Sequence, residues 1–500
     1  MHPWMDPKPI AAFAAAAALL AGCSAIRPVT GTSDISLAAG QSETTATTVR
    51  SNGVDRILVS FNDETSPGKT LVYGQNSRKV NAGASLMGWA WSENKGDTWT
   101  YAGKVSTPAG WPVLWGDPAM TTSGANYSVA FLSNLAIPQS KFPAGGINGA
   151  VTYGSNSAYI GGACIYRTVD GGKTFNFYQC FGNTEPNAYD PDATKGHFYD
   201  GGSLASTPSG EIFAAYVDVT TSKIDVWRAA NASAPFARIG DPFPGLVALS
   251  HARLRASLDG SLYAAATIGT QGGFIVFMNR YRNGSWGQAV QASEFMELYP
   301  SINFNSTVAG SPLTIRTGPQ FSFDLGAPSE LGNDEIRMLV TRRSAQNRLF
   351  VEASACAADL TNCHPVPQWF VGPRDAREVP SDVFNPNVSA WRGFFGLPPQ
   401  WTSSFYERYG ASPTTVNLGR MYLGLVNGAP LGIPVDIAKN IPVCSDTRGY
   451  WGDYDDMLMI GFKDTTPVFM RFTSTDAGKG CNKRWNYVSS HLHVQSVREP

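Results

Sequence analysis

Short polar stretches and short apolar strands alternate along most of the chain. In "YDGGSLASTPSGEIFAAYVD", which begins at Tyr199, a polar residue precedes a short strand, a glycine-containing turn follows, and a more apolar strand with aromatic residues ends the unit. Short apolar runs bounded by Gly, Pro, Asn, Asp and Ser are typical of β-strands joined by tight turns. The pattern therefore predicts an all-β protein built from hairpins.

The same unit recurs at intervals of about fifty to eighty residues. Besides Tyr199, units begin at Gln41, Gly116, His251, Thr317, Asn385 and Trp451. A pair of inner strands followed by an outer hairpin, repeated at this spacing, is typical of β-propeller blades. Two packed sandwiches are the alternative, but they explain the repeated unit less well. The seven starts favour a β-propeller with seven blades.

Composition adds that the chain is rich in turns and lightly charged. Its 500 residues include 51 Gly and 33 Pro, and 15% are charged, which suits many short strands better than long helices. The formal net charge of −1, without a basic run, offers nothing that would attract nucleic acid. His-Glu-x-x-His and Gly-x-Ser-x-Gly motifs do not occur, so zinc protease and serine hydrolase chemistry has no support. We expect neither a cofactor nor a catalytic metal, with structural calcium left open.

Two eight-residue stretches share the pattern Ser/Thr-x-Asp/Asn-x-Gly-x-Thr-aromatic. They are "SENKGDTW" at Ser92–Trp99 and "TVDGGKTF" at Thr168–Phe175, and a degenerate copy, "STDAGKG", begins at Ser474. Gly-Lys-Thr at 172–174, within the second stretch, does not belong to a phosphate loop, because the position of the required first glycine is occupied by Arg167. The Asp or Asn can accept backbone N–H bonds across a turn, and the glycine allows positive φ. We therefore predict structural turns.

This pattern resembles the Asp-box, or BNR repeat, of sialidase-like β-propellers. The resemblance extends from about Gln41 to the C-terminus and includes "FYER" at Phe405–Arg408 and "GDY" at Gly452–Tyr454. It implies that each box is the turn between the third and fourth strands of a blade, away from the ligand face. Sialidases have six blades, so six remains open here, since the last two units could share one blade.

The N-terminal segment is expected to direct export. An apolar run at Ile10–Gly22 is too short to span a bilayer comfortably and is typical of a signal-peptide core. Leu-Ala-Gly-Cys at Leu20–Cys23 resembles a bacterial lipobox. This implies a signal peptide at 1–22, acylation of Cys23, a linker to residue 40, a propeller at 41–500 and, with Ser24 next, an outer-membrane anchor. An ordinary secretory peptide is the alternative.

Six cysteines remain after Cys23, and an even number in an exported chain suggests disulfides. Cys164 and Cys180 are centred on the second box, and Cys356 and Cys363 flank the short loop "AADLTN". Both pairs are expected to bridge hairpins, which leaves Cys444 and Cys481 for each other. Sequence alone does not determine this connectivity. Metal-binding thiolates are less favoured because no Cys-x-x-Cys occurs.

The starts of the inner strands should meet at one end of a central channel, where propellers bind ligands. The repeat places a ring of charged residues there: Glu43, Asp117, Asp200, Arg253, Arg316 and Asp453. Tyr406, Arg408, Tyr454, His197 and His251 are expected nearby. Carboxylates, guanidinium groups and phenols together suit a polar and acidic sugar, because arginine binds a carboxylate through two donors.

The family resemblance also implies catalytic roles. Sialidases hold the substrate carboxylate with three arginines and use an aspartic acid as acid/base and a tyrosine nucleophile paired with a glutamate. The matching candidates here are Arg253, Arg316 and Arg408 for the carboxylate, Asp117 as acid/base, and Tyr406 with Glu407, or Tyr454, as nucleophile. Asp200 and Asp453 would contact substrate.

One departure from the family pattern keeps a second function open. Sialidases carry Arg-Ile-Pro near the first inner strand, whereas the corresponding strand here is "SETTATTV". Glu407 adjoins Tyr406, so the two would face opposite sides of a strand. The sequence thus predicts a propeller that engages glycans, either as an exo-acting sialidase-type hydrolase or as a non-catalytic module for carbohydrate or protein binding. A protein partner is not identified.

Overall fold

The computed structural model consists entirely of β-strands and connections over the residues it describes, with no helix among them. Described residues are 28–29, 41–63, 72–74, 77–80, 84–123, 127–138, 151–152, 161–182, 199–219, 221–297, 301–304, 313–316, 320–326, 335–343, 349–366, 382–391, 400–408, 415–422, 435–442, 457–460, 468–476 and 490–498. No helix in this part of the chain could span a membrane.

Most described strands form seven antiparallel sheets, or blades, that follow chain order. Blade 1 contains β2 (Gln41–Ser51), β3 (Val54–Asp63), β7 (Met87–Ser92) and β8 (Thr100–Lys104). Blade 2 contains β9 (Val113–Thr122), β10 (Ala130–Ile137), β12 (Gly162–Thr168) and β13 (Asn176–Gly182), with β6 (Ala84–Ser85) parallel to β9. Blade 3 contains β14 (Tyr199–Ser206), β15 (Ile212–Asp218), β16 (Lys223–Ala229) and β17 (Ala237–Gly240).

The remaining four blades repeat this arrangement. Blade 4 contains β18 (Ala248–Ala256), β19 (Leu262–Thr270) and β20 (Gly273–Arg282), with β21 (Ser285–Trp286), β22 (Val290–Gln291) and β23 (Met296–Glu297) along β20. Blade 5 contains β26 (Phe321–Leu325), β27 (Glu335–Arg343), β28 (Leu349–Ala357) and β29 (His364–Pro365). Blade 6 contains β30 (Asp382–Trp391), β31 (Gln400–Arg408), β32 (Thr415–Tyr422) and β33 (Val435–Pro442). Blade 7 contains β34 (Met457–Ile460), β35 (Val468–Asp476), β36 (Ser490–Arg498) and β1 (Pro28–Val29).

Two smaller sheets lie outside the blades. One contains β4 (Val72–Gly74), β5 (Ser77–Val80) and β11 (Val151–Thr152). The other is the hairpin of β24 (Ser301–Phe304) and β25 (Leu313–Arg316).

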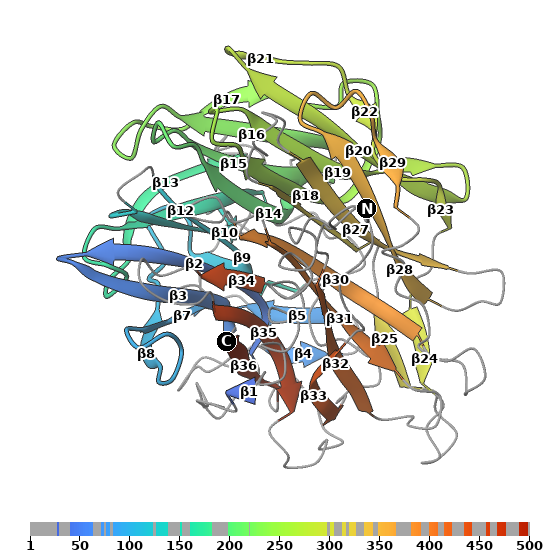
Figure 1. The fold of residues 1–500 in the computed structure, drawn as a ribbon. Helices are drawn as coiled ribbons and strands as arrows, with labels where there is room; N and C mark the ends of the chain where they lie inside the picture. The colour runs from blue at the N-terminus through green and yellow to red at the C-terminus, as the bar shows by residue number, and fades with distance from the viewer. Residues whose placement is uncertain are drawn as a thin grey trace, which may run out of the picture.

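The seven blades close into a ring. Their first strands, β2, β9, β14, β18, β26, β30 and β34, contact one another in that order, and β34 contacts β2. Figure 1 shows the chain colour running around this ring, from blue through green and yellow to red. The prediction of a seven-bladed propeller is confirmed. The six-blade alternative was wrong, because β30–β33 and β34–β36 form separate sheets.

The last blade is completed by the N-terminal end of the chain. Pro28 pairs with Val497 and Val29 with Ser496, so β1 is the outermost strand of blade 7. These two residues lie inside the segment expected to be a linker. Cys23 and residues 1–22 lie outside the described residues.

The hydrophobic core lies between neighbouring blades. Phe131 and Ile165 of blade 2, for example, pack in one cluster with Leu204 and Tyr216 of blade 3. Each sheet is covered on both faces by its neighbours, so a second strand such as β15, "IFAAYVD", is buried along its whole length. This explains why the second strand of each unit is the more apolar one in the sequence.

The two box-like stretches form turns between the third and fourth strands of blades 1 and 2. In the second, Asp170 Oδ1 accepts bonds from Lys173 N, Thr174 N and Thr168 Oγ1 at 3.0, 3.1 and 2.7 Å. In the first, Asn94 Oδ1 likewise accepts bonds from Thr98 N and Ser92 Oγ, both at 2.9 Å. The predicted structural role of these turns is confirmed. Most of the degenerate copy after Ser474 lies outside the described residues.

Two of the expected disulfides are present. Cys164 on β12 and Cys180 on β13 are direct cross-strand partners and are bonded. Cys356 on β28 is bonded to Cys363, just before β29. Both bonds therefore join the third strand of a blade to its outer edge. Cys444 and Cys481 lie outside the described residues.

Candidate functional site

A cavity of about 250 Å³ occupies the centre of the ring. It is lined by the first strands of six successive blades, from β2 of blade 1 to β30 of blade 6. Most polar residues in its lining carry hydroxyl groups, and the charged ones are two arginines and one aspartate: Thr44, Thr45, Thr47, Thr121, Ser203, Ser206, Ser389, Arg253, Arg255 and Asp324. We call this cavity the central channel.

Some of these hydroxyl groups join the blades. Thr45 Oγ1 accepts a bond from Met120 N at 3.2 Å, and Ser203 Oγ accepts one from Leu254 N at 2.9 Å. In each case a side chain of one first strand receives a backbone N–H from the first strand of the next blade. β14 and β18 have no further strand on their channel side, and β9 pairs with β6 only at Val113 and Leu114, so such bonds satisfy backbone donors that would otherwise lack a partner.

Arg255 and Asp324 form an ion pair in the channel, across the junction of blades 4 and 5. Arg255 Nε lies 3.5 Å from Asp324 Oδ1, and the guanidinium lies over the Phe323 ring at 6.0 Å. Asp324 also accepts backbone bonds, from Leu325 N at 2.9 Å and Ala390 N at 2.8 Å. The side chain of Arg255 remains one-third exposed. The carboxylate is thus held by several donors, and the guanidinium, which also donates to Leu254 O at 3.0 Å, belongs to a residue that lines the channel.

Several first strands pair irregularly with the second strand of their blade. Register shifts occur near the start of β2, β14 and β30. Asp117 and Asn385, each followed by proline, have φ of 54° and 49°. A non-glycine residue in this region is strained, and such strain often occurs at functional sites.

Several predicted site residues lie in or beside the channel. Arg253 lines it directly, and Asp117 immediately precedes the lining residue Pro118. Asp200 is half-buried at the start of β14, where its Oδ1 accepts a bond from Gly201 N at 3.0 Å. Glu43 immediately precedes Thr44 on β2. The channel lining itself comes from the middle of β2 and from the second halves of β9, β14 and β18, and not from the starts of these strands.

Other predicted residues lie elsewhere. Tyr406 and Glu407 are on β31, the second strand of blade 6, and are 0% and 1% exposed, so neither reaches the channel in this structure. The Tyr406 ring lies 5.8 Å from that of Phe384, which suits a packing role for this tyrosine. Arg316 ends β25, in the hairpin outside the blades, and not on a first strand as predicted.

The remaining candidates have no described side chain. Arg408 is the last residue of β31, and His251 lies on β18. Asp453, Tyr454 and His197 lie outside the described residues. Among residues that the structure describes, no group of three or more His, Cys, Asp or Glu side chains could hold a metal ion.

Sequence reasoning missed Arg255 and Asp324. Arg255 had a usable signal, because it follows Arg253 by two positions, and alternate residues of a strand face the same side. Asp324 had no such signal. The repeat placed the start of its unit at Thr317, four residues before β26 begins at Phe321, so Asp324 did not coincide with a predicted strand start.

No family model matches the chain, and no curated protein matches its sequence. Solved structures with a similar arrangement include a protein of unknown function from Dyadobacter fermentans, with 11% identity, a TM-score of 0.41, and coverage of 79% of this chain and 98% of that one. The polysaccharide lyase Uly1 has 7% identity, a TM-score of 0.41, and coverage of 93% and 98%. An ulvan lyase of polysaccharide lyase family PL25 has 10% identity, a TM-score of 0.40, and coverage of 72% and 75%.

Proposed function

We propose that the protein binds glycans in its central channel and recognises an acidic sugar there through Arg253 and Arg255. The observation that carries the proposal is the lining itself, in which hydroxyl groups from several blades surround two arginines on one strand. Hydroxyl groups can both donate and accept hydrogen bonds to sugar hydroxyls, and guanidinium groups bind carboxylates through paired donors.

The size of the channel favours one small polar unit. Its volume of about 250 Å³ is slightly below the roughly 300–1,000 Å³ of typical small-molecule sites. A terminal sugar fits this space better than a run of sugars. We therefore expect the terminal sugar of a glycan chain to enter the channel.

Calorimetric titration with N-acetylneuraminate, glucuronate and neutral galactose tests this proposal. We expect the acidic sugars to bind more tightly than galactose, and Arg253→Ala and Arg255→Ala each to weaken acidic-sugar binding about tenfold or more, as loss of a charge-assisted bond of ~1.5–3 kcal/mol implies. Arg50→Ala is the matched control, because Arg50 pairs with Asp55 on an exposed hairpin of blade 1. Equal binding of acidic and neutral sugars would contradict the proposal.

A second candidate function is hydrolysis of the sialidase type, with Asp117 as acid/base. The strained φ of Asp117, directly beside the channel lining, favours it. Release of a fluorophore from aryl glycosides, sialosides included, is the measurement. Turnover that Asp117→Ala abolishes would establish the enzyme, whereas a folded protein without turnover on any substrate leaves the binding function.

The cellular setting completes the proposal. Two disulfides are typical of exported proteins. We propose a lipid anchor at Cys23, after a signal peptide at 1–22, and attachment to the outer membrane with the propeller outside the cytoplasm. Metabolic labelling with a fatty-acid analogue, lost in Cys23→Ala, tests the anchor.

A further inference from the structure

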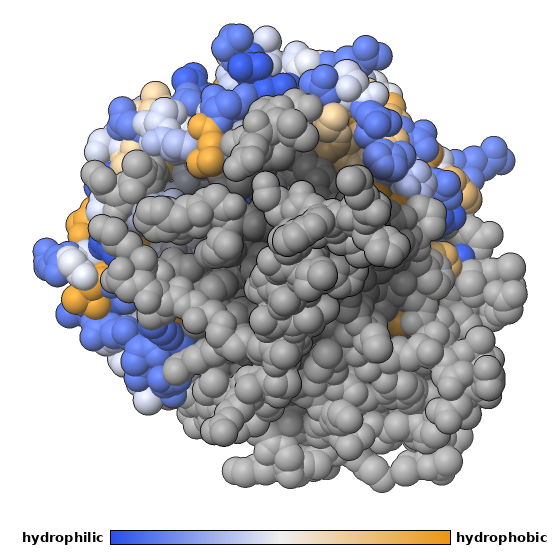
Figure 2. All heavy atoms as spheres, viewed as in Figure 1, coloured by the Kyte–Doolittle hydropathy of each residue, from blue (hydrophilic) through white to orange (hydrophobic). Residues whose placement is uncertain are grey.

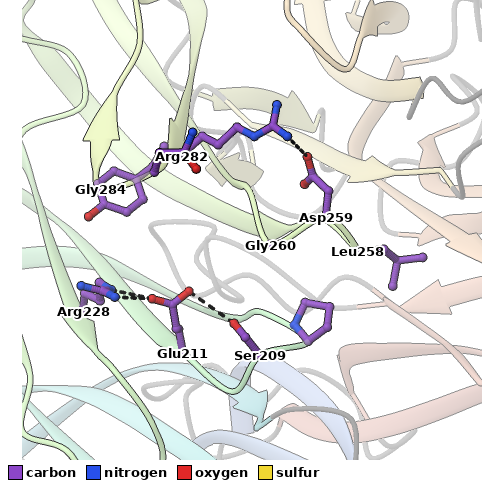
Figure 3. Close-up of a pocket in the computed structure, with 11 residues that line it drawn as sticks. Ser209, Glu211, Arg228, Leu258, Asp259, Gly260, Arg282 and Gly284 are labelled. Atoms are coloured by element: carbon purple, nitrogen blue, oxygen red, sulfur yellow. Dashed lines mark hydrogen bonds and ion pairs between the residues drawn. The ribbon is translucent and has the colours of Figure 1, made fainter.

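A second cavity, of about 460 Å³, lies between blades 3 and 4. We call it the blade 3–4 groove. Its walls are the β14–β15 turn at 207–211, the β18–β19 turn at 257–261 and the tip of the β20–β21 hairpin at 281–284 (Figure 3). In an antiparallel blade, the turn after the first strand lies at the end opposite the start of that strand. The groove is therefore at the other end of the blades from Asp117 and Asp200.

The two turns that form the walls are built alike. Thr207 N donates to Glu211 O at 2.9 Å, and Ser257 N donates to Ser261 O at 2.8 Å. Gly210 and Gly260 occupy the same place in each turn with φ of 94° and 82°, a region that favours glycine. The groove thus has a defined shape on both sides.

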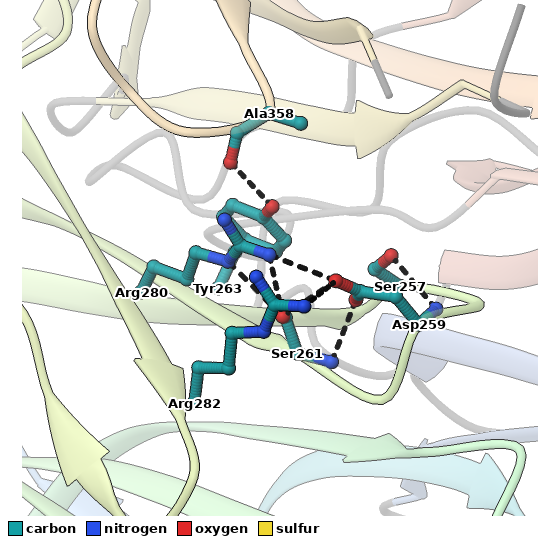
Figure 4. Close-up of polar contacts among 7 residues, drawn as sticks. All are labelled: Ser257, Asp259, Ser261, Tyr263, Arg280, Arg282 and Ala358. Carbon is teal, nitrogen blue, oxygen red and sulfur yellow. Dashed lines mark hydrogen bonds and ion pairs between the residues drawn. The ribbon is translucent and has the colours of Figure 1, made fainter. Parts of the chain in front are cut away.

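In each blade an arginine of the third strand holds the turn. Arg228 pairs with Glu211 in blade 3, with Nε at 2.8 Å from Oε1. Arg280 pairs with Asp259 in blade 4 at 2.8 Å and also donates to Ser261 Oγ at 3.0 Å (Figure 4). The two arginines are opposite equivalent second-strand residues, Phe213 and Tyr263. The side chains of Arg228 and Arg280 therefore stabilise the turns of their own blades.

Arg282 differs from both of these arginines. It is the last residue of β20, its side chain is 56% exposed, and its ion pair with Asp259 is long, at 3.7 Å. Asp259 already receives the shorter contact from Arg280, as Figure 4 shows. An exposed Asp359 also interacts with Arg280 but does not line the groove. Arg282 therefore has donors to offer a ligand anion in the groove, at little cost to its existing pair.

Apolar groups lie on the same walls. Leu258, at 52% exposed, and Pro208 come from the two turns, and Tyr281 packs against Trp286 at 5.1 Å beside the hairpin tip. Hydrophilic residues predominate among the coloured residues of the face in Figure 2, with scattered hydrophobic ones between them. A groove that joins apolar side chains to an available guanidinium suits a sugar ring, which has both C–H faces and polar substituents.

We propose that the blade 3–4 groove is a second glycan site, which takes a sugar carrying one anionic group, a carboxylate or a sulfate ester, and binds that group through Arg282. The groove volume lies within the range of small-molecule sites. The proposal goes beyond the channel function and does not depend on it, because the two cavities share no lining residue.

The test uses the whole oxidised protein and three sugars of similar size: glucuronate, galactose 6-sulfate and galactose. Calorimetric titration of the Arg253→Ala/Arg255→Ala protein, whose channel lacks both proposed arginines, isolates the groove. We expect one acidic-sugar site there, and at least a tenfold loss of its affinity when Arg282→Ala is added. Arg50→Ala is the exposed control. The tighter of the two anions identifies the carboxylate or the sulfate as the natural group.

Different failures are distinguishable. If Arg282→Ala binds both anions as the unmodified protein does, or if galactose binds as tightly as they do, the groove proposal is overturned. A different result would overturn the channel proposal alone: Arg253→Ala leaves the total binding of acidic sugars unchanged, while Arg282→Ala weakens it. Because Arg282 is exposed, the melting temperature of its variant should match that of the control, which shows that lost binding is not lost folding.

Discussion

At the scale of single residues, Asp170 shows how one carboxylate holds a turn. Partial burial alone would raise its pKa, but bonds from Thr174, Thr168 and the backbone N–H groups of Thr174 and Lys173 outweigh this and hold the pKa below its usual range. The equivalent residue in blade 1 is Asn94, which makes similar bonds with an amide oxygen. Geometry therefore matters more than charge at this position.

We expect Asp170→Ala to lower the free energy of unfolding by about 1–3 kcal/mol, because backbone donors of the turn lose their acceptor. Asp170→Asn should cost clearly less, as Asn94 already fills this role in blade 1. Urea denaturation of both variants measures the difference. Equal losses would mean that the carboxylate charge, and not the acceptor geometry, stabilises the turn.

The same carboxylate predicts a dependence on pH. Its pKa is lower in the folded chain than in the unfolded chain, where an Asp has a pKa of about 3.9. Its contribution is therefore complete above about pH 4 and is lost as pH falls through the folded-state pKa. Between pH 5 and pH 2.5 the stability gap between the unmodified protein and Asp170→Asn should shrink; a constant gap would contradict this.

At the scale of elements, the outer strand of a blade is its weakest part, because it pairs on one side only. In β13, most side chains are exposed or half-buried, whereas β10 in the same blade is entirely buried. The Cys164–Cys180 bond joins β13 to β12, and Cys356–Cys363 joins β28 to the segment before β29. The disulfides thus reinforce edges that little apolar burial secures.

Replacing both Cys164 and Cys180 by alanine should lower the free energy of unfolding by about 2–4 kcal/mol. Amide exchange should become faster in Asn176–Gly182, the strand that the bond retains. The Cys356→Ala/Cys363→Ala protein is the matched comparison, with a smaller expected loss because its sequence separation is 7 and not 16. Unchanged amide exchange in β13 would show that hydrogen bonding to β12 alone keeps β13 in the sheet.

At the scale of the whole molecule, the ring is closed by strands from both ends of the chain. β1 pairs with β36, and β34 contacts β2 of the first blade. A ring of blades has no free sheet face once it is closed, so closure protects the apolar faces of the first and last blades from water.

A protein that begins at Gln41 lacks β1 and tests this closure. We expect faster amide exchange in Ser490–Arg498 and a lower melting temperature than in a protein beginning at Ser24, since β36 becomes an edge strand. Exchange in β15, far around the ring, serves as the internal control. Equal exchange rates in β36 would mean that β1 adds nothing to closure.

The sequence by itself determined the repeat, the strand order and the structural turns. All seven unit starts lie within seven residues of a first strand, because burial between neighbouring blades imposes the same apolar pattern on every unit. Cys164 with Cys180 and Cys356 with Cys363 were also predictable, since hairpin pairing is local in sequence.

Only the tertiary structure decided which polar residues meet. Tyr406 and Arg316 resemble site residues in the sequence, yet one is buried on a second strand and the other lies on a hairpin outside the blades. Arg255 and Asp324 meet across a blade junction although 69 positions separate them, and the groove at Arg282 needs two blades to form. The local pattern of apolar and polar residues predicts whether a side chain is buried. Which side chains share a cavity depends on the stagger and curvature of sheets that are distant in sequence.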